Sequence, residues 1–136
     1  MTVEHTTTLR VRYSETDQMG TVYNSRVLEW FEVGRTELLR AIGLPYAQME
    51  AQGVFLPLVE ARVRYLGRAA YDDDLRITSR IAPEGKASLR FEIDITHADD
   101  RPVARGHTIH AVTSAEGKPV RPPAWLVDKI NSSAGE

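Results

Sequence analysis

One acidic side chain stands where it could do chemistry, in a short polar turn just ahead of the longest helical pattern in the chain. Asp17 lies three residues before Gly20, and the helical pattern begins at about Asn24. Free backbone N–H groups at a helix N-terminus can stabilise a developing oxyanion. A nearby carboxylate can attack a carbonyl carbon or activate water. An aspartate in such a turn can also simply hydrogen-bond the backbone, so both interpretations stay open at this point.

Other common catalytic and metal-binding motifs are absent from the sequence. It contains no P-loop, no Gly-x-Gly-x-x-Gly, no His-Glu-x-x-His and no Gly-x-Ser-x-Gly. It also contains no cysteine, which excludes disulfides, thiolate nucleophiles and thiolate metal ligands. Among the histidines only His107 and His110 lie near each other, and residues three apart on a strand point to opposite faces. The sequence therefore predicts no metal site, and structural or surface roles for His5, His97, His107 and His110.

Length and composition indicate one globular domain over residues 1–136, with 42% hydrophobic and 26% charged residues. A formal net charge of -2 gives no global attraction to nucleic acid or to an anionic membrane. The N-terminus lacks an apolar signal segment, and no run approaches the ~20 apolar residues of a membrane helix. We therefore expect a cytoplasmic protein with neither a nucleic-acid nor a membrane partner.

Hydrophobic periodicity predicts the elements that must position Asp17. Residues 6–13 alternate as in a half-buried strand, and a helix follows with Asn24 or Ser25 as its N-cap and Gly43 as its stop. Gly34 inside this helix predicts close approach to a neighbouring element. Shorter helical segments are expected at 46–52 and from Trp125 to Ile130, with fraying over residues 132–136.

Four more strands are predicted by period-two patterns, at about 59–65, 75–81, 89–96 and 102–114. Their short connections predict antiparallel neighbours along the chain. A helix of ~18 residues is ~27 Å long, which matches the breadth of five strands ~4.8 Å apart. We therefore predict an α+β fold in which one long helix is wrapped by a curved antiparallel sheet of about five strands. The other sheet face is charged, and an exposed edge strand invites pairing with a second copy.

Two segments resemble a known family: VRYSETDQMGTVYNSRVLEWFEVGR, and GLPYAQMEAQGVFLPLVEARVRYLGRAAYDDDL further on. They are similar to hotdog-fold thioesterases of the 4-hydroxybenzoyl-CoA thioesterase and small acyl-CoA thioesterase type. The resemblance extends from about Leu9 to Trp125, and its most specific run is Y-x-E-T-D-x-M-G, from Tyr13 to Gly20. In that run the catalytic carboxylate of the family falls on Asp17. The resemblance implies hydrolysis of an acyl-CoA thioester without a metal or an organic cofactor.

The resemblance also implies roles for residues around Asp17. Asp17 would act as general base or as nucleophile, and the sequence leaves both open. Amides around Tyr23 and Asn24 would receive the carbonyl oxygen, while Gly20 would let the chain turn beside the substrate. Relatives often carry an aromatic or histidine pair followed by Asn-Tyr after this point, whereas this chain runs Tyr23, Asn24, Ser25, Arg26, Val27, which leaves the details of the substrate pocket open.

In this architecture the acyl pocket would lie between two subunits of a homodimer or homotetramer. Residues 54–58 of one chain would face the Asp17 loop of the other, and Phe55 and Pro57 would either shape the pocket or pack at the interface. The phosphates of coenzyme A require basic groups near the entrance, for which the candidates are Arg62, Arg64, Arg68 and Lys86. Glu29 and Glu32 are assigned to a solvated helix face.

Two alternatives to an acyl-CoA thioesterase remain open. One is a thioesterase acting on acyl groups held by a carrier protein, which would need a basic docking patch in place of a nucleotide site. The other is a non-catalytic hotdog module that binds acyl-CoA. The presence of Asp17 favours an enzyme over the silent module.

Overall fold

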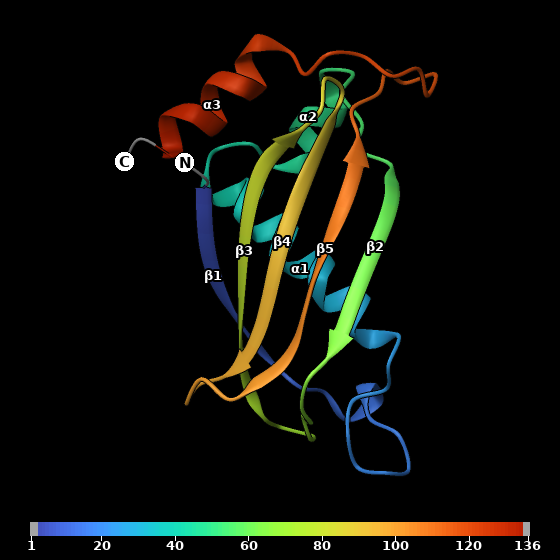
Figure 1. The fold of residues 1–136 in the computed structure, drawn as a ribbon, viewed down its shortest axis with the longest axis vertical. Helices are drawn as coiled ribbons and strands as arrows, with labels where there is room; N and C mark the ends of the chain where they lie inside the picture. Colours follow the sequence, from blue (N-terminus) through green and yellow to red (C-terminus); the bar gives the residue numbers. More distant parts are fainter. Residues whose placement is uncertain (1–2, 135–136) are drawn as a thin grey trace.

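The computed structural model describes residues 3–134 and places one long helix against a five-stranded antiparallel sheet (Figure 1). The strand order is β1-β3-β4-β5-β2. The strands are β1 (Val3–Arg10), β2 (Leu58–Tyr65), β3 (Asp74–Glu84), β4 (Ser88–His97) and β5 (Pro102–Ala111). The predicted α+β hotdog architecture is confirmed, with every expected strand present.

The sequence predicted that β2 would pair with β3, the next strand along the chain, and this prediction is wrong. β3, β4 and β5 form successive hairpins, but β2 pairs with β5, and β1 occupies the place beside β3. β1 and β2 are therefore the two edges of the sheet (Figure 1). β1 pairs along its whole length with β3, from Val3 opposite Ile81 to Arg10 opposite Asp74, so β2 cannot pair at that edge. The connection 66–73 therefore crosses the end of the sheet.

Helix α1 (Arg26–Ala41) lies along the inner face of the sheet (Figure 1). Its buried stripe recurs at helical spacing and includes Val27, Trp30, Phe31 and Leu38. Ser25 is the N-cap, although its side chain makes no capping bond. Gly43 ends the helix at a φ of +82°, and the N–H of Leu44 donates to the carbonyl of Leu39. The predicted start and stop of the helix are thus confirmed.

Gly34 lies where α1 packs closely against the sheet. A Cβ at this position would lie 2.5 Å from Ser79 Oγ and 2.7 Å from Ile77 Cγ2, both on β3. The predicted close approach is confirmed, with β3 side chains as the nearest groups. Ser79 Oγ is buried and has no hydrogen-bond partner among residues 3–134. The helix therefore packs directly against β3 at this point. A side chain at position 34 would have to displace the β3 side chains or push the helix away from the strand.

Two shorter helices complete the described chain. α2 (Tyr46–Ala51) precedes β2, and α3 (Ala124–Ala134) contacts β1 and buries Leu126 and Ile130. Fraying was expected from residue 132, but the helix continues to Ala134, and residues 135–136 lie outside the described range. Within residues 3–134 no helix is both long enough and apolar enough to cross a membrane.

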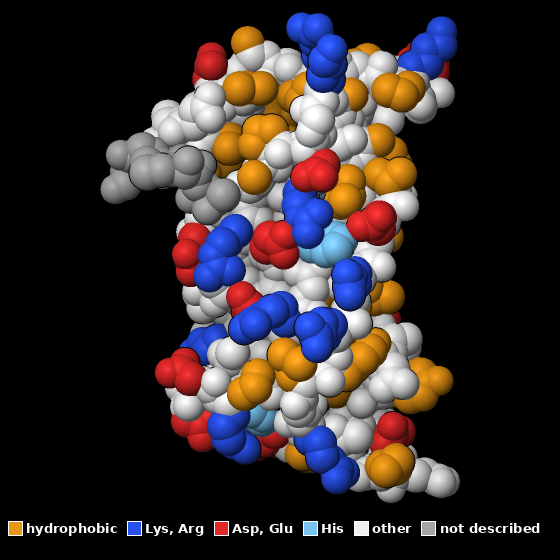
Figure 2. All heavy atoms as spheres, viewed as in Figure 1, with side chains coloured by type: hydrophobic (Ala, Val, Ile, Leu, Met, Phe, Trp, Pro, Cys, Tyr) orange, Lys and Arg blue, Asp and Glu red, His pale blue; other side chains and the backbone are white. Residues whose placement is uncertain are grey.

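The outer face of the sheet is charged, as predicted, and its charges are paired across strands. Figure 2 shows acidic and basic side chains intermixed over the middle of this face. Arg80 and Asp94 join β3 to β4 at 3.1 Å, and His107 and Glu60 join β5 to β2 at 2.6 Å. His110 points to the inner face, where it is buried. The two neighbouring histidines therefore lie on opposite faces of the sheet, as expected.

Candidate active site

Asp17 lies in a tight loop between the single 3-10 turn η1 (Tyr13–Glu15) and the start of α1. An antiparallel bridge between Thr16 and Val22 closes the loop. Within it the Asp17 N–H donates to Thr21 O at 3.0 Å, and the Gly20 N–H donates to Asp17 O at 3.0 Å. Gly20 has a φ of +75°, which a side chain would disfavour. The loop is therefore a defined turn that projects Asp17 at a fixed point.

The two oxygens of the Asp17 carboxylate have different surroundings. Oδ1 accepts a hydrogen bond from the Met19 N–H at 2.9 Å, the usual bond of an aspartate turn. Oδ2 accepts none from the part of the chain that the structure describes. The carboxylate is exposed and lines a hollow together with Gly20, Tyr13 and Tyr71, whose rings meet edge to face at 5.6 Å. One oxygen thus fixes the turn, and the other is free to act on a ligand.

Glu15 is a buried carboxylate that the sequence analysis did not identify. It accepts hydrogen bonds from the Arg12 N–H at 2.7 Å and from Trp30 Nε1 at 2.8 Å. Burial raises the pKa of Glu15, but the hydrogen bonds from Trp30 and Arg12 outweigh burial and lower this pKa below its ordinary value of 4.5. Glu15 therefore ties the Asp17 loop to α1 in its ionised form.

We expect Glu15→Gln to destabilise the fold by about 2 kcal/mol at pH 7, because charge-assisted hydrogen bonds are lost inside the protein. A carboxylate with a lowered folded pKa stabilises the fold above its unfolded pKa, and this contribution disappears as the pH falls through the folded value. The difference between parent and variant should therefore be full at pH 7 and shrink steadily below pH 4.5. Urea unfolding of both proteins across this range measures it, and a pH-independent difference would contradict the role of the charge.

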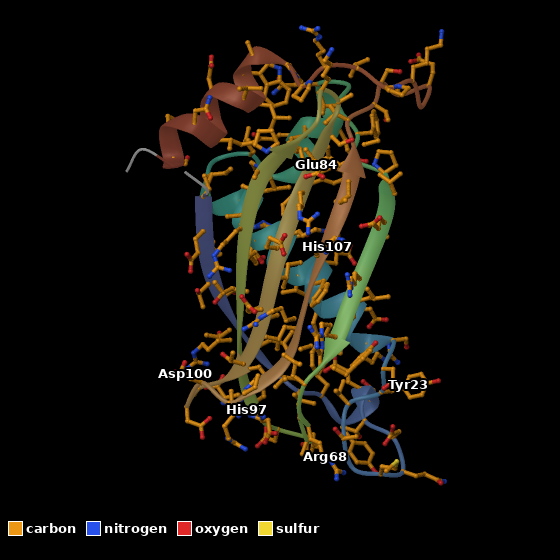
Figure 3. The ribbon with its side chains drawn as sticks, in the orientation of Figure 1. Tyr23, Arg68, Glu84, His97, Asp100 and His107 are labelled. Carbon is orange, nitrogen blue, oxygen red and sulfur yellow. The ribbon has the colours of Figure 1, made fainter. Side chains whose placement is uncertain are left out.

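The helix start supplies fewer free amides than expected. The Tyr23 N–H donates to Glu15 O at 2.8 Å, which takes it out of the expected oxyanion site. The Asn24 N–H has no partner within residues 3–134, and the Asn24 carbonyl accepts from the Tyr65 hydroxyl at 2.9 Å. The Tyr23 side chain is exposed at the same end of the molecule as Arg68 (Figure 3). The Ser25 N–H has no partner in this range either, so the amides of Asn24 and Ser25 at the helix start stay free to donate.

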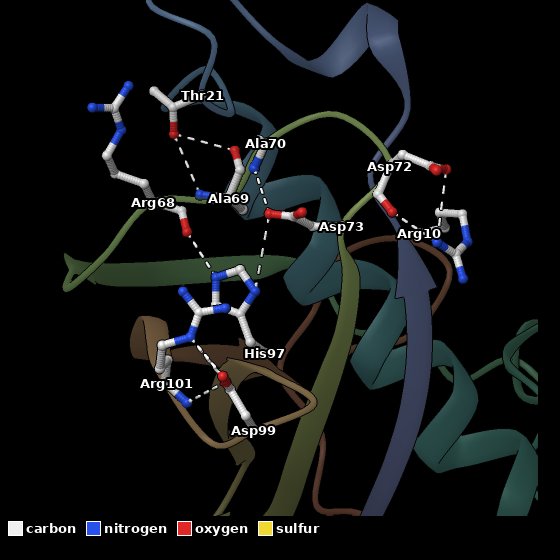
Figure 4. Close-up of polar contacts among 10 residues, drawn as sticks. All are labelled: Arg10, Thr21, Arg68, Ala69, Ala70, Asp72, Asp73, His97, Asp99 and Arg101. Carbon is white, nitrogen blue, oxygen red and sulfur yellow. Dashed lines mark hydrogen bonds and ion pairs between the residues drawn. The ribbon is translucent and has the colours of Figure 1, made fainter.

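The crossing connection 66–73 hydrogen-bonds the loop that carries Asp17, and Figure 4 shows the contacts between Thr21 and Ala69. The Val22 N–H and the Thr21 hydroxyl both donate to Ala69 O, at 2.8 Å and 3.2 Å. The Arg68 guanidinium donates to Met19 O at 2.7 Å, and the Arg68 carbonyl bonds His97 Nε2 at 2.8 Å. The loop that carries Asp17 is thus positioned by residues about fifty places further along the chain.

The four basic candidates do not form one site within the chain. Arg62 and Arg64 are exposed on the outer face of β2, and Arg68 contacts the Asp17 loop. Lys86 lies in the turn between β3 and β4, and Figure 3 shows the neighbouring Glu84 at the opposite end of the sheet from Arg68. Lys86 is therefore separated from Arg68 by the length of the hairpin, while Arg62 lies opposite His107 in the middle of the sheet.

A second hollow, a cavity of about 200 Å³, lies between α1, α2 and the start of β2. Its lining includes Glu32, Arg35, Leu39, Tyr46, Leu56 and Leu58. Phe55 and Pro57, which the sequence analysis named, are not in the lining, and the backbone of Phe55 pairs with Thr113. Side chains alternate along this extended segment, so the cavity receives Leu56 and Leu58 instead. Applying the alternation of β2 to residues 54–58 could have indicated this.

Burial shifts the pKa of two of the titratable groups that line the cavity, His110 and Arg35. Burial lowers the pKa of His110, and the charge of Arg35 lowers it further against the opposing bond to Leu56. The ring is therefore neutral at pH 7, with Nδ1–H donating to Leu56 O at 3.0 Å. Burial also lowers the pKa of Arg35, against the charge of Glu32. Arg35 remains charged, so the cavity combines an apolar wall with a guanidinium and the Glu32 carboxylate.

This sheet around a single long helix, with a carboxylate turn beside the helix start, defines the class of hotdog thioesterases. The family model described as Thioesterase-like superfamily matches residues 11–130, and the chain belongs to this family. The resemblance seen in the sequence is thereby confirmed, as is the class of thioester hydrolases.

Individual relatives agree with this assignment. "Putative acyl-CoA thioesterase YneP" of Bacillus subtilis is 49% identical over 57 residues, which are 42% of this chain and 41% of that protein. Acyl-CoA thioester hydrolase YbgC of Escherichia coli is 32% identical over 92 residues, 68% of this chain and 69% of the relative. The solved 1,4-dihydroxy-2-naphthoyl-CoA thioesterase from Synechocystis shares the fold, with a TM-score of 0.86 at 22% identity over 96% of both chains.

Proposed function

We propose that this protein hydrolyses acyl-CoA thioesters, with Asp17 as the catalytic residue. The proposal depends on one observation above all, the unpaired Oδ2 of Asp17 in an open hollow beside the start of α1. An unpaired carboxylate oxygen can act on a substrate without first breaking a bond to the protein. The names of YneP and YbgC support acyl-CoA as the substrate class.

Thioester chemistry suits a site with a single carboxylate. Asp17 either takes a proton from water, whose oxygen attacks the carbonyl carbon, or attacks that carbon itself to form an anhydride that water then cleaves. On both routes the carbon–sulfur bond breaks, the thiolate leaves and is protonated, and the free acid remains. The Asn24 amide would stabilise the carbonyl oxygen as its charge grows, with the α1 dipole adding positive potential.

A panel of acyl-CoA substrates tests the proposal directly. Release of free thiol is measured with short aliphatic, long aliphatic and aromatic acyl-CoA at pH 7, and with the same acyl groups on a carrier protein. We expect turnover of at least one acyl-CoA class at rates well above hydrolysis in buffer. Turnover only on the carrier protein would redirect the proposal to that substrate, and no turnover on any thioester would overturn it.

A further inference from the structure

The tip of the Asp17 loop is not anchored by packing in the core. Residues 17–20 are all exposed, so their position depends on hydrogen bonds. Within the range 3–134, the bonds that reach residues 17–22 from outside the loop come from Arg68 and Ala69, in the connection 66–73. The position of the Asp17 carboxylate therefore depends on where this connection lies.

The two ends of the connection are bonded to neighbouring backbone. The Leu66 N–H donates to Val103 O at 2.9 Å, and the Asp72 N–H donates to Val11 O at 2.9 Å. The stretch 68–71 between these ends contains both residues that bond the Asp17 loop. In the part of the chain that the structure describes, only one residue of the sheet bonds this stretch, and that residue is His97.

His97 is held rigidly at the end of a central strand. It is the last residue of β4, which pairs with β3 on one side and β5 on the other, and it is 7% exposed. Its Nε2 lies 2.8 Å from Arg68 O, and because a carbonyl oxygen only accepts, Nε2 carries the hydrogen. Figure 4 shows the ring between the Arg68 carbonyl and the carboxylate of Asp73, whose Oδ2 lies 4.0 Å from Nδ1. The sheet therefore offers the connection a fixed point.

This fixed point is linked to Asp17 through Arg68. His97 holds the Arg68 carbonyl, and the Arg68 guanidinium donates to Met19 O at 2.7 Å. The Met19 N–H in turn donates to Asp17 Oδ1 at 2.9 Å. The free Oδ2 belongs to the same carboxylate, so a shift of Arg68 would move the oxygen that is proposed to react.

We propose that His97 is a positioning residue for thioester hydrolysis, which sets the place of the Asp17 carboxylate by holding the Arg68 carbonyl. This inference rests on the proposed function, in which Asp17 is catalytic. A displacement of ~1 Å in a reacting group can cost up to ~10²-fold in rate. The bond affects the geometry of reaction and not the binding of the substrate. Its loss should therefore lower kcat and leave KM nearly unchanged.

Two substitutions of His97 test this role against a matched control. His97→Leu removes the bond with a side chain of similar size, and it should lower kcat by about 10-fold. His97→Gln should recover most of the parent kcat, because the glutamine amide can donate from the position of Nε2. His107→Leu is the control, since His107 bonds Glu60 on the outer face and not the connection 66–73, and it should keep the parent kcat.

The Asp17→Asn background separates positioning from damage to the fold. Without the carboxylate there is nothing left for His97 to position, so adding His97→Leu should cost no further activity. A loss of folded enzyme would instead lower the rate by the same factor in both backgrounds. Equal factors in the two backgrounds, or a parent kcat in His97→Leu, would overturn the proposal.

Amide hydrogen exchange tests the positioning without any substrate. The Gly20 N–H is bonded within the loop and the Val22 N–H is bonded to Ala69 O. Both should exchange about 10-fold faster in His97→Leu than in the parent, and at the parent rate in His97→Gln. Unchanged exchange in His97→Leu would contradict the hold of His97 on the loop.

A second variant covers the case in which His97→Leu does not fold. His97→Asn keeps a polar side chain, but its amide is too short to reach Arg68 O, so it should show the same loss of kcat and the same faster exchange. Parent values for both in this variant would overturn the proposal. A parent that hydrolyses no thioester, while its loop responds to His97 as expected, would reject the proposed function and leave the hold of His97 on the loop standing.

Discussion

Replacing Asp17 by asparagine is expected to lower thioester turnover by about 10²-fold or more, the usual scale for a lost acid–base group. Asparagine keeps the shape of the side chain, and its carbonyl oxygen can still accept from the Met19 N–H. What the variant loses is the unpaired, negatively charged oxygen, which is the group needed to activate water or attack the carbonyl carbon. Turnover on the best substrate of the panel measures the effect.

A neighbouring aspartate provides the control for this variant. Asp72 adjoins Tyr71, which lines the same hollow, and its exposed carboxylate only meets Arg10 at 3.7 Å. Its backbone has a φ of 72°, a conformation that asparagine also tolerates. Asp72→Asn should therefore keep the parent rate. Equal rates for the parent and Asp17→Asn would remove Asp17 from the mechanism, and equal losses in both variants would point to a change in local charge.

Gly106→Ala should be the most destabilising small substitution in the sheet. A Cβ on this β5 residue would collide with the carbonyl oxygen of Arg62 and would lie 3.0 Å from Phe31 Cε2. The first neighbour is backbone of β2, so it can give way only if β2 moves away from β5. Overpacking of a well-packed core usually costs about 1–3 kcal/mol, and a backbone clash of this kind belongs above that range, at more than ~3 kcal/mol. Urea unfolding at pH 7 measures the loss.

Gly34→Ala is the comparison for this change. Its closest neighbours are the side chains of Ser79 and Ile77, which can shift more easily than backbone. Alanine also gains ~1 kcal/mol of helix propensity over glycine. Gly34→Ala should therefore cost less than Gly106→Ala. The opposite order would show that β2 can move apart from β5 more easily than α1 can lift from β3.

The elements themselves could be predicted because their hydrophobic periods are clear. The alternation in β4 and the helical stripe of α1 repeat long enough to identify both. The strand order could not be read in the same way. Short connections favour hairpins, but the place beside β3 is taken by β1, a strand more than sixty residues earlier in the chain. Periodicity carries no information about such distant pairing.

The sequence predicted site residues only where a local motif marks them. The run from Tyr13 to Gly20 predicted Asp17 and Gly20, whereas the sequence did not single out Leu56 and Leu58, which line the cavity. Glu15 lies in the same run, but its burial depends on Trp30, on another element. Arg35 reads as an ordinary exposed helix residue until the fold brings Leu56 and His110 against it. Contacts between elements distant in sequence decide these roles.

The bonds from Ala69 and Arg68 to the loop of residues 16–22 also bear on how the protein is made. Asp17 is synthesised early, but the segment that braces its loop follows β2, and β2 finds its place only beside β5, which ends at Ala111. Forming contacts between such distant segments is entropically costly and slow. In a nascent chain Asp17 would therefore be present long before the segment that braces its loop, and the loop would take its final form only late in folding.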